Sequence, residues 1–138
     1  MILLDHLLQI EKIEDPTERQ AYAHGLYLTN KTFARLCDLA YRRSVQSRYM
    51  NGEEFPSFKQ DPVPYGYNYS QLERAFNKLK VAGFFEDGKK SLPDDIANRK
   101  LTQVFESLSD VECRFVQYLL RKDIPWFDRE SWKVAKHS

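Results

Sequence analysis

Residues 33–49, FARLCDLAYRRSVQSRY, decide the fold class and carry the strongest functional signal of the chain. Apolar side chains recur there at helical spacing, which predicts a helix with one buried stripe. These side chains are Phe33, Leu36, Leu39 and Ala40. Arginines lie among and after them, and no acidic residue follows Asp38 within the stretch. The pattern is typical of a helix that presents cations to a polyanion, and an ordinary solvated helix has the same pattern.

The length and composition indicate one folded domain. The 138 residues are enough for a hydrophobic core without disulfides or metal. Apolar residues make up 42% and aromatic residues 14% of the chain, which argues against global disorder. The formal net charge is only +1, so binding of nucleic acid would need a local basic patch. Cys37 and Cys113 each lie in an apolar helical pattern and are expected to be reduced core residues.

Helical patterns continue on both sides of this stretch. They predict an all-α, single-domain bundle of six to seven helices. Asp15, Ser109 and Asp128 are suited to begin helices as N-caps, and Ser109 starts a capping-box pattern. The predicted helices cover about 2–13, a segment after Asp15, 32–50, 69–82, 94–107, 110–122 and a last helix ending near Lys136.

Residues 51–68, NGEEFPSFKQDPVPYGYN, interrupt the helical pattern. The prolines exclude a regular helix there. The aromatic residues are too many for a solvated linker, so we expect one long, ordered loop that lies across the helices. Functional loops have this length and character, and so do structural straps.

The sequence shows no pattern that indicates catalysis. His6, His24 and His137 lack the spacing of metal ligands, and no glycine-rich phosphate loop is present. The carboxylate pair Asp94-Asp95 suits a helix start, where negative charge is favoured. We therefore expect no enzyme, no cofactor and no small-molecule substrate.

The hydrophobic segments do not indicate a membrane protein. No apolar run approaches the roughly 20 residues of a membrane span. The first ten residues, MILLDHLLQI, have no basic start and no small-residue cleavage site, so they do not predict a signal peptide. We expect a soluble, intracellular protein without a membrane partner.

Basic residues are the remaining functional signal. Positioned cations can hold phosphates without reading bases, which is sufficient for sequence-independent binding of duplex DNA. Several of these residues lie near predicted helix C-termini, where cations are favoured in any case. The candidate phosphate-binding residues are Arg42, Arg43, Arg48, Arg99, Lys100 and Lys122.

Residues 33–43 (FARLCDLAYRR), 98–102 (NRKLT) and 110–124 (ending LRKDI) also carry a resemblance to a known family. In order and rough spacing they resemble the N-terminal helical DNA-binding domain of the ATP-dependent DNA ligases of T-even-type phages. Residues 55–58 and 62–66 resemble small uncharacterised phage proteins in which such a helical head stands alone.

The resemblance implies a phage-type accessory protein that binds the backbone of duplex DNA. It further implies a place in the cytoplasm of an infected bacterium or association with the virion. It does not imply ligase activity, because Phe85 stands where the lysine of the Lys-x-Asp-Gly motif would precede Asp87-Gly88. Gln103-Val104 and Pro125-Trp126 also replace the family's turn residues, which could approach DNA.

The near-zero net charge and the aromatic loop favour a second interpretation. The chain would then be a protein-interaction module, such as a virion component or a host-takeover adaptor that binds a phage or host protein. Aromatic residues dominate interface hot spots. The candidate anchors are Phe58, Tyr65, Tyr67 and Trp126. A continuous basic face would favour DNA, and an exposed aromatic patch ringed by mixed charge would favour a protein partner.

Overall fold

The computed structural model describes residues 2–42, 49, 54–56, 72–81, 84 and 93–138. Within these residues there are seven helices and no strand, and 77% of the residues are helical. The prediction of an all-α, single-domain bundle of six to seven helices is confirmed. The helices are α1 (Leu3–Lys12), α2 (Pro16–Thr29), α3 (Lys31–Tyr41), α4 (Leu72–Val81), α5 (Asp94–Ser107), α6 (Asp110–Arg121) and α7 (Arg129–Lys136).

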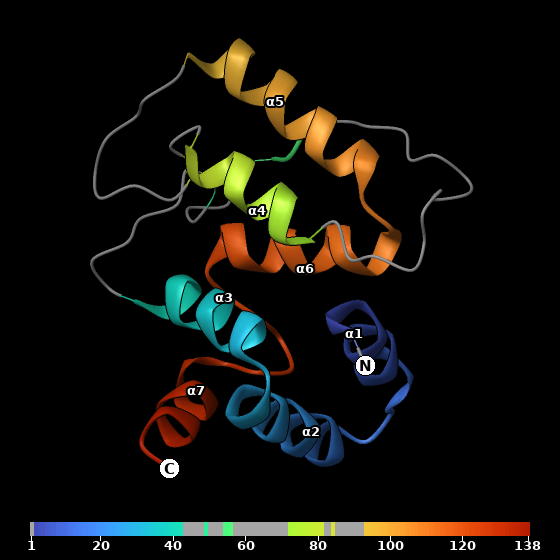
Figure 1. Cartoon of the computed structure of the whole chain (residues 1–138), viewed down its shortest axis with the longest axis vertical. Helices are drawn as coiled ribbons and strands as arrows, with labels where there is room; N and C mark the ends of the chain where they lie inside the picture. Colours follow the sequence, from blue (N-terminus) through green and yellow to red (C-terminus); the bar gives the residue numbers. More distant parts are fainter. Residues whose placement is uncertain (1, 43–48, 50–53, 57–71, 82–83, 85–92) are drawn as a thin grey trace.

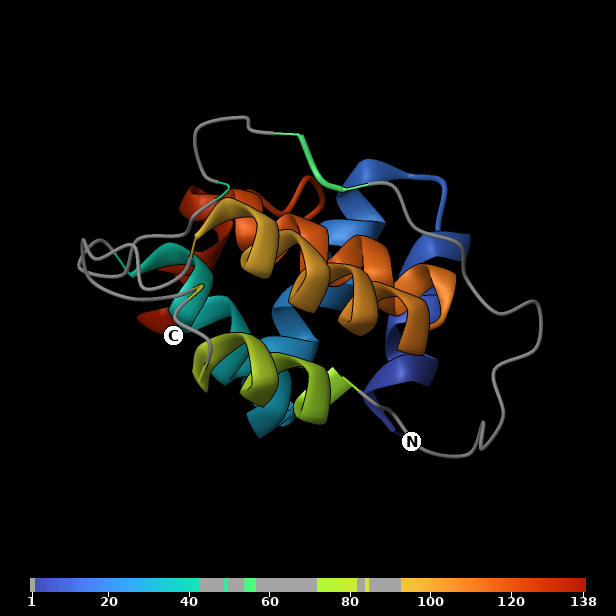
Figure 2. The same ribbon diagram turned by 90° about the horizontal axis from the view of Figure 1, so that it is seen from above.

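The helices are arranged in tiers around α6 (Figure 1). α6 packs against α1, α3 and α4, whereas α5 packs against α4, and α2 and α7 pack against α3. In the view from above, α4 and α5 lie side by side on one face of the bundle (Figure 2). α6 therefore connects the pair formed by α4 and α5 with α1 and α3.

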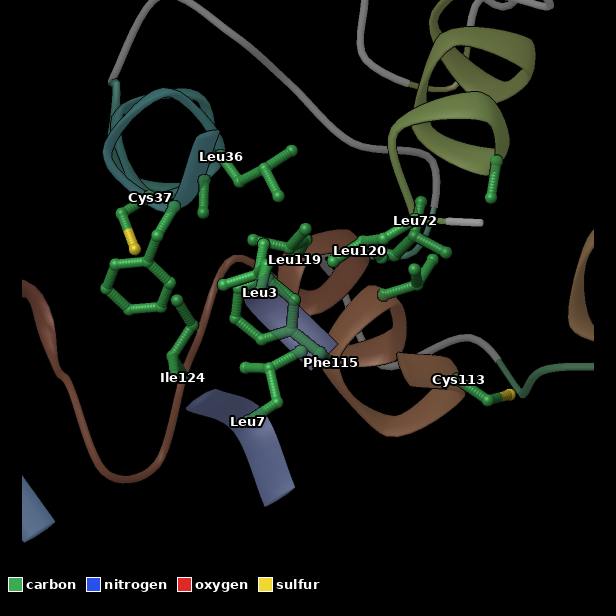
Figure 3. Packing of buried hydrophobic residues seen from close by; sticks show 14 of the residues in the cluster. Leu3, Leu7, Leu36, Cys37, Leu72, Cys113, Phe115, Leu119, Leu120 and Ile124 are labelled. Atoms are coloured by element: carbon green, nitrogen blue, oxygen red, sulfur yellow. The ribbon is translucent and has the colours of Figure 1, made fainter. Parts of the chain in front are cut away.

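The core is built on the apolar stripe of α6. Phe115, Leu119 and Leu120 are almost fully buried. Figure 3 shows these side chains between Leu7 of α1 and Leu72 of α4. Removal of so many apolar side chains from water is the main source of stability for a bundle of this size.

Both cysteines are core residues, as the sequence predicts. Cys37 is 0% exposed and Cys113 is 3% exposed, and both are free thiols. Burial raises the pKa of Cys113 to about 12 and holds the pKa of Cys37 well above its ordinary value. Both thiols therefore remain protonated at neutral pH.

The predicted caps are also present at the helix starts. Asp15 accepts a hydrogen bond from the backbone N–H of Thr17 at 3.0 Å, and Asp128 accepts one from Ser131 at 2.8 Å. The predicted capping box forms at Ser109. These side chains satisfy backbone donors that a helix leaves open at its first turn.

The predicted end of the third helix is wrong. The sequence favoured a helix over 32–50, but α3 ends at Tyr41, and Arg42 has extended backbone angles of φ −65° and ψ 123°. The backbone carbonyl of Tyr41 accepts a hydrogen bond from Arg129, and that of Arg42 accepts one from Lys122. Side chains from the end of the chain thus bind the carbonyls that a longer helix would have used internally.

The loop predicted for 51–68 is described only at residues 54–56. Phe55 is half-buried and packs with its ring centroid 4.9 Å from that of Tyr49. It also meets Phe105 of α5 edge to face at 5.7 Å. This part of the segment is therefore anchored on the helical core by aromatic packing.

Candidate nucleic-acid interface

Tyr41 fixes the end of α3 to the segment that joins α6 and α7. Its buried hydroxyl donates to the backbone carbonyl of Phe127 at 2.6 Å and accepts from the backbone N–H of Ile124 at 2.9 Å. Its ring also lies 5.6 Å from that of Trp132. Burial raises the pKa of Tyr41 above its ordinary range, so the hydroxyl keeps its proton and its role as a donor.

α6 ends in a left-handed residue that is not glycine. Lys122 has φ 57° and ψ 36°. Its N–H donates to the carbonyl of Leu119, and the N–H of Asp123 donates to that of Tyr118, which is the hydrogen-bond pattern of a Schellman motif. Glycine is usual at this position because it carries no Cβ. Here the position holds a lysine whose Nζ donates to the backbone carbonyl of Arg42 at 2.7 Å.

Arg129 supplies the next cation, from the first residue of α7. Its Nη1 donates to the backbone carbonyl of Tyr41 at 2.6 Å, and its guanidinium lies 5.4 Å from the centre of the Tyr41 ring. Arg42, Lys122 and Arg129 therefore meet at the carboxyl end of α3, and we call these three residues the basic cluster. The negative end of the α3 dipole favours cations at this point.

The basic cluster holds like charges close together. Arg42 is exposed, whereas Lys122 and Arg129 are half-buried. Burial, and then the charge of Arg129, lowers the pKa of Lys122 below its ordinary value. Asp123 and Asp128 lie beside the cluster. The carboxylate of Asp128 accepts a hydrogen bond from the backbone N–H of Ser131 at the amino end of α7. The three cations outnumber the two carboxylates, so the net charge of these five side chains is positive.

The structure brings together only some of the residues predicted to bind phosphate. Lys122 reaches Arg42, because its Nζ donates to the backbone carbonyl of that residue. Arg99 and Lys100 are exposed on α5, which packs on α4 and not at the α3 end (Figure 1). Arg43 and Arg48 lie outside the described residues.

Sequence reasoning missed Arg129 as a member of the site. A signal was present, because Arg129 directly follows the cap of a predicted helix. A cation in the first turn faces the positive end of the helix dipole and is locally unfavourable. Such a residue indicates a tertiary or functional reason for its charge, and here the reason is its place over the end of α3.

A further contact connects the end of α6 with α5. The guanidinium of Arg121 lies 4.3 Å from the centre of the Phe55 ring, and its Nη1 donates to the carbonyl of Tyr49 at 3.1 Å. The hydroxyl of Tyr49 in turn donates to Oδ1 of Asn98 at 3.0 Å. Arg99 follows Asn98 directly in the sequence. These contacts therefore connect the part of α5 that carries Arg99 with the end of α6, next to Lys122.

The aromatic residues predicted as protein anchors are only partly described. Trp126 is half-buried and stacks on the core rings of Phe33, at 6.1 Å, and Phe115, at 5.9 Å. It also lines a cavity of about 160 Å³ together with Arg19 and Gln20. The remaining candidate anchors lie outside the described residues: Phe58, Tyr65 and Tyr67.

The described residues contain no group of three or more side chains that could hold a metal ion. None of the helices that the structure describes is long and apolar enough to cross a membrane. Comparison of the chain with protein-family models, with curated proteins and with solved structures found no match.

Proposed function

We propose that this chain is a non-catalytic, phage-type accessory protein that binds duplex DNA through backbone phosphates. The observation that carries the proposal is that Lys122, at the end of α6, and Arg129, at the start of α7, both reach the backbone carbonyls at the end of α3, beside Arg42. Binding of this kind needs positioned cations and does not need contacts to the bases.

The local conformations support a functional role for these charges. Lys122 occupies a left-handed position that favours glycine, and Arg129 lies in the first turn of a helix, where cations are disfavoured. Local preferences that are violated in this way concentrate at functional sites. A bound phosphate would also stabilise the charged form of Lys122, whose pKa burial and Arg129 now lower.

The hydrogen-bonding capacity of the side chains suits phosphate. A guanidinium presents several N–H donors in a fixed plane, and the described contacts of Arg129 use one of them on the carbonyl of Tyr41. Arginine binds phosphate oxygens with paired, charge-assisted hydrogen bonds. Arg42 is exposed beside it and can extend the contact to a neighbouring phosphate of the same strand.

The resemblance to the ligase domain agrees with this location. Residues 33–43 contain Arg42, and residues 110–124 contain Lys122, so two of the three similar stretches meet at the basic cluster. The resemblance thus supports the basic cluster as the DNA-binding site, which the positions of the charged residues also indicate.

The test is binding of a labelled blunt duplex at a series of salt concentrations. The variants Arg42→Gln, Lys122→Gln and Arg129→Gln should weaken binding equally for unrelated sequences. Each lost contact should lower the slope of log affinity against log salt by about 0.9. Lys12→Gln, which removes an exposed charge at the end of α1, is the matched control and should leave the slope unchanged.

An affinity that does not depend on salt, or equal losses in the control and the cluster variants, would contradict the proposal. Absence of duplex binding at low salt would favour the protein-interaction alternative. Among the candidate anchors of that alternative, Trp126 lies within the described residues. Its ring already stacks on the core rings of Phe33 and Phe115.

A further inference from the structure

The last helix, α7, carries basic residues along one face. Arg129, Lys133 and Lys136 follow one another at positions i, i+4 and i+7, and residues at this spacing lie on one face of a helix. They extend over about 10 Å of the helix axis. We call these three residues the α7 stripe. Because Arg129 also belongs to the basic cluster, the stripe begins at the cluster and continues along α7.

Both ends of the α7 stripe are fixed relative to α3. Arg129 donates to the backbone carbonyl of Tyr41, as described above. At the other end, Nζ of Lys136 lies 4.7 Å from the centre of the Trp132 ring. Nε1 of that tryptophan donates to Oδ1 of Asp38 in α3 at 2.9 Å. The cations at the two ends are therefore held in place by contacts that also join α7 to α3.

The α7 stripe nevertheless reaches solvent. Lys136 is exposed, and the side chain of Lys133 is 42% exposed. An ammonium that lies over an aromatic ring keeps N–H donors for other acceptors. α7 packs against α2 and α3 and lies at the edge of the bundle (Figure 1). A large anionic ligand can therefore approach the stripe from outside the bundle.

The helix dipole explains only part of this arrangement. Cations are favoured in the last turn of α7, which holds Lys133 and Lys136, but they are disfavoured in the first turn, which holds Arg129. A stripe that runs the full length of the helix therefore has a further reason for its charge. A DNA strand carries one phosphate for about every 3.4 Å of helix axis, so several successive phosphates of one strand can lie along a stripe of this length.

One carboxylate competes for the middle of the stripe. Oε1 of Glu130 lies 3.5 Å from Nζ of Lys133, and the side chain of Glu130 is 81% exposed. Exposed ion pairs of this kind contribute little to stability because water and salt screen them. A phosphate that binds Lys133 therefore has to displace Glu130, and this displacement costs little.

From these features we infer that one strand of the bound duplex runs along α7, and that its phosphates contact Arg129, Lys133 and Lys136. Glu130 limits the affinity, because it competes with phosphate for Lys133. The inference rests on the proposed binding of duplex DNA. It adds two phosphate-binding lysines, a competing carboxylate and a direction for the strand, from the basic cluster to the carboxyl end of α7.

The first experiment is the salt series with the labelled blunt duplex. Lys133→Gln and Lys136→Gln should each lower the slope of log affinity against log salt by about 0.9, because each removes one phosphate contact. Lys136→Arg keeps the charge and should keep the slope. Lys12→Gln, at the end of α1, is again the matched control and should leave the slope unchanged.

The second experiment uses Glu130→Gln, for which the inference predicts the opposite sign. This variant should bind the duplex about two- to fivefold more tightly at low salt, the range expected for release of one exposed ion pair. The gain should shrink when Glu130→Gln is combined with Lys133→Gln, because the carboxylate then has no ammonium to occupy. An equal gain in both backgrounds would overturn the role of Glu130.

The outcomes separate this inference from the proposed function. If Lys133→Gln and Lys136→Gln bind as wild type does while Arg129→Gln binds more weakly, the strand does not follow α7 and the proposed function stands. If the wild type binds no duplex at low salt, both fail. Circular dichroism of each variant shows whether the helices are intact. Lys133→Gln keeps the test valid where Lys136→Gln disturbs the packing on Trp132.

Discussion

The hydroxyl of Tyr41 donates a hydrogen bond of 2.6 Å to the backbone carbonyl of Phe127. The same oxygen accepts the backbone N–H of Ile124 at 2.9 Å. One buried side chain at the end of α3 therefore satisfies two backbone groups of the segment between α6 and α7. Because Lys122 and Arg129 lie at the two ends of that segment, Tyr41 sets the geometry of the basic cluster.

Replacement of Tyr41 by phenylalanine should destabilise the protein by about 1–3 kcal/mol, because it leaves a buried N–H and a buried carbonyl without their partner. Urea unfolding followed by circular dichroism measures this cost. Tyr118→Phe is the matched control, since Tyr118 is half-buried and no described contact uses its hydroxyl as a hydrogen-bonding group. Equal losses of stability in the two variants would contradict the role assigned to the Tyr41 hydroxyl.

Lys122 should impose a backbone cost that glycine relieves. Lys122→Gly and Lys122→Ala both remove the ammonium and its hydrogen bond to Arg42, so their difference isolates the left-handed backbone. The glycine variant should be more stable than the alanine variant by about 1 kcal/mol. Both should lose affinity for duplex DNA to the same extent. Alanine as stable as glycine would mean that the backbone at this position is not strained.

Local patterns were sufficient to predict most of the fold. α5 spans the predicted 94–107, and α7 begins after the predicted cap Asp128 and ends at Lys136. These ends depend on caps and on apolar spacing within a few residues, which sequence shows directly. The resulting all-α bundle followed from the sum of such local signals.

The end of α3 and the composition of the site could not be predicted in this way. The segment after Tyr41 continues with residues that are compatible with a helix, and only the donors of Lys122 and Arg129 show where it stops. Those donors lie about 80 residues away in the sequence. Asp38 likewise appeared as one acid among arginines, whereas it accepts hydrogen bonds from Tyr27 and Trp132.

The N-cap Asp128 of α7 should contribute to the free energy of unfolding at neutral pH and lose this contribution in acid. Hydrogen bonds from the Ser131 backbone and side chain lower the pKa of Asp128 below its ordinary value of 3.8. The stabilisation is therefore complete above pH 3.8 and is lost as the pH falls through the lowered pKa. Asp128→Asn keeps a capping oxygen but does not titrate, so its difference from wild type should disappear in acid.

At neutral pH, Asp128→Ala should cost about 1 kcal/mol through loss of the cap, and Asp128→Asn should cost less. Urea unfolding of wild type and both variants at neutral and acidic pH measures these differences. A constant difference between wild type and Asp128→Asn across the acidic range would contradict the lowered pKa.

The two thiols should be unreactive in the folded protein. Burial raises the pKa of Cys113 to about 12 and that of Cys37 well above its ordinary value, so almost no thiolate forms near neutral pH. Alkylation by iodoacetamide should therefore be slow in buffer and fast in denaturant, as followed by intact mass. A thiol that is modified in the native protein at the rate of the unfolded chain would contradict its burial.

The contacts of Asp38 should make the stability fall in alkaline solution. Burial first, and then the hydrogen bond and charge of Asp38, raises the pKa of Tyr27 above its ordinary value of 10.0. The unfolded chain loses this proton at a lower pH than the folded protein. The contribution of Tyr27 is therefore complete below pH 10.0 and is lost as the pH rises toward the raised pKa.

Asp38→Ala should cost about 1.5–3 kcal/mol at neutral pH, because the Tyr27 hydroxyl and Trp132 Nε1 lose a charged acceptor. It should also shift the ionisation of Tyr27 toward its ordinary pKa, since two causes of the rise are removed. Spectroscopic titration of tyrosinate, with Tyr27→Phe to assign the signal, measures this shift. An unchanged titration in Asp38→Ala would mean that burial alone raises the pKa of Tyr27.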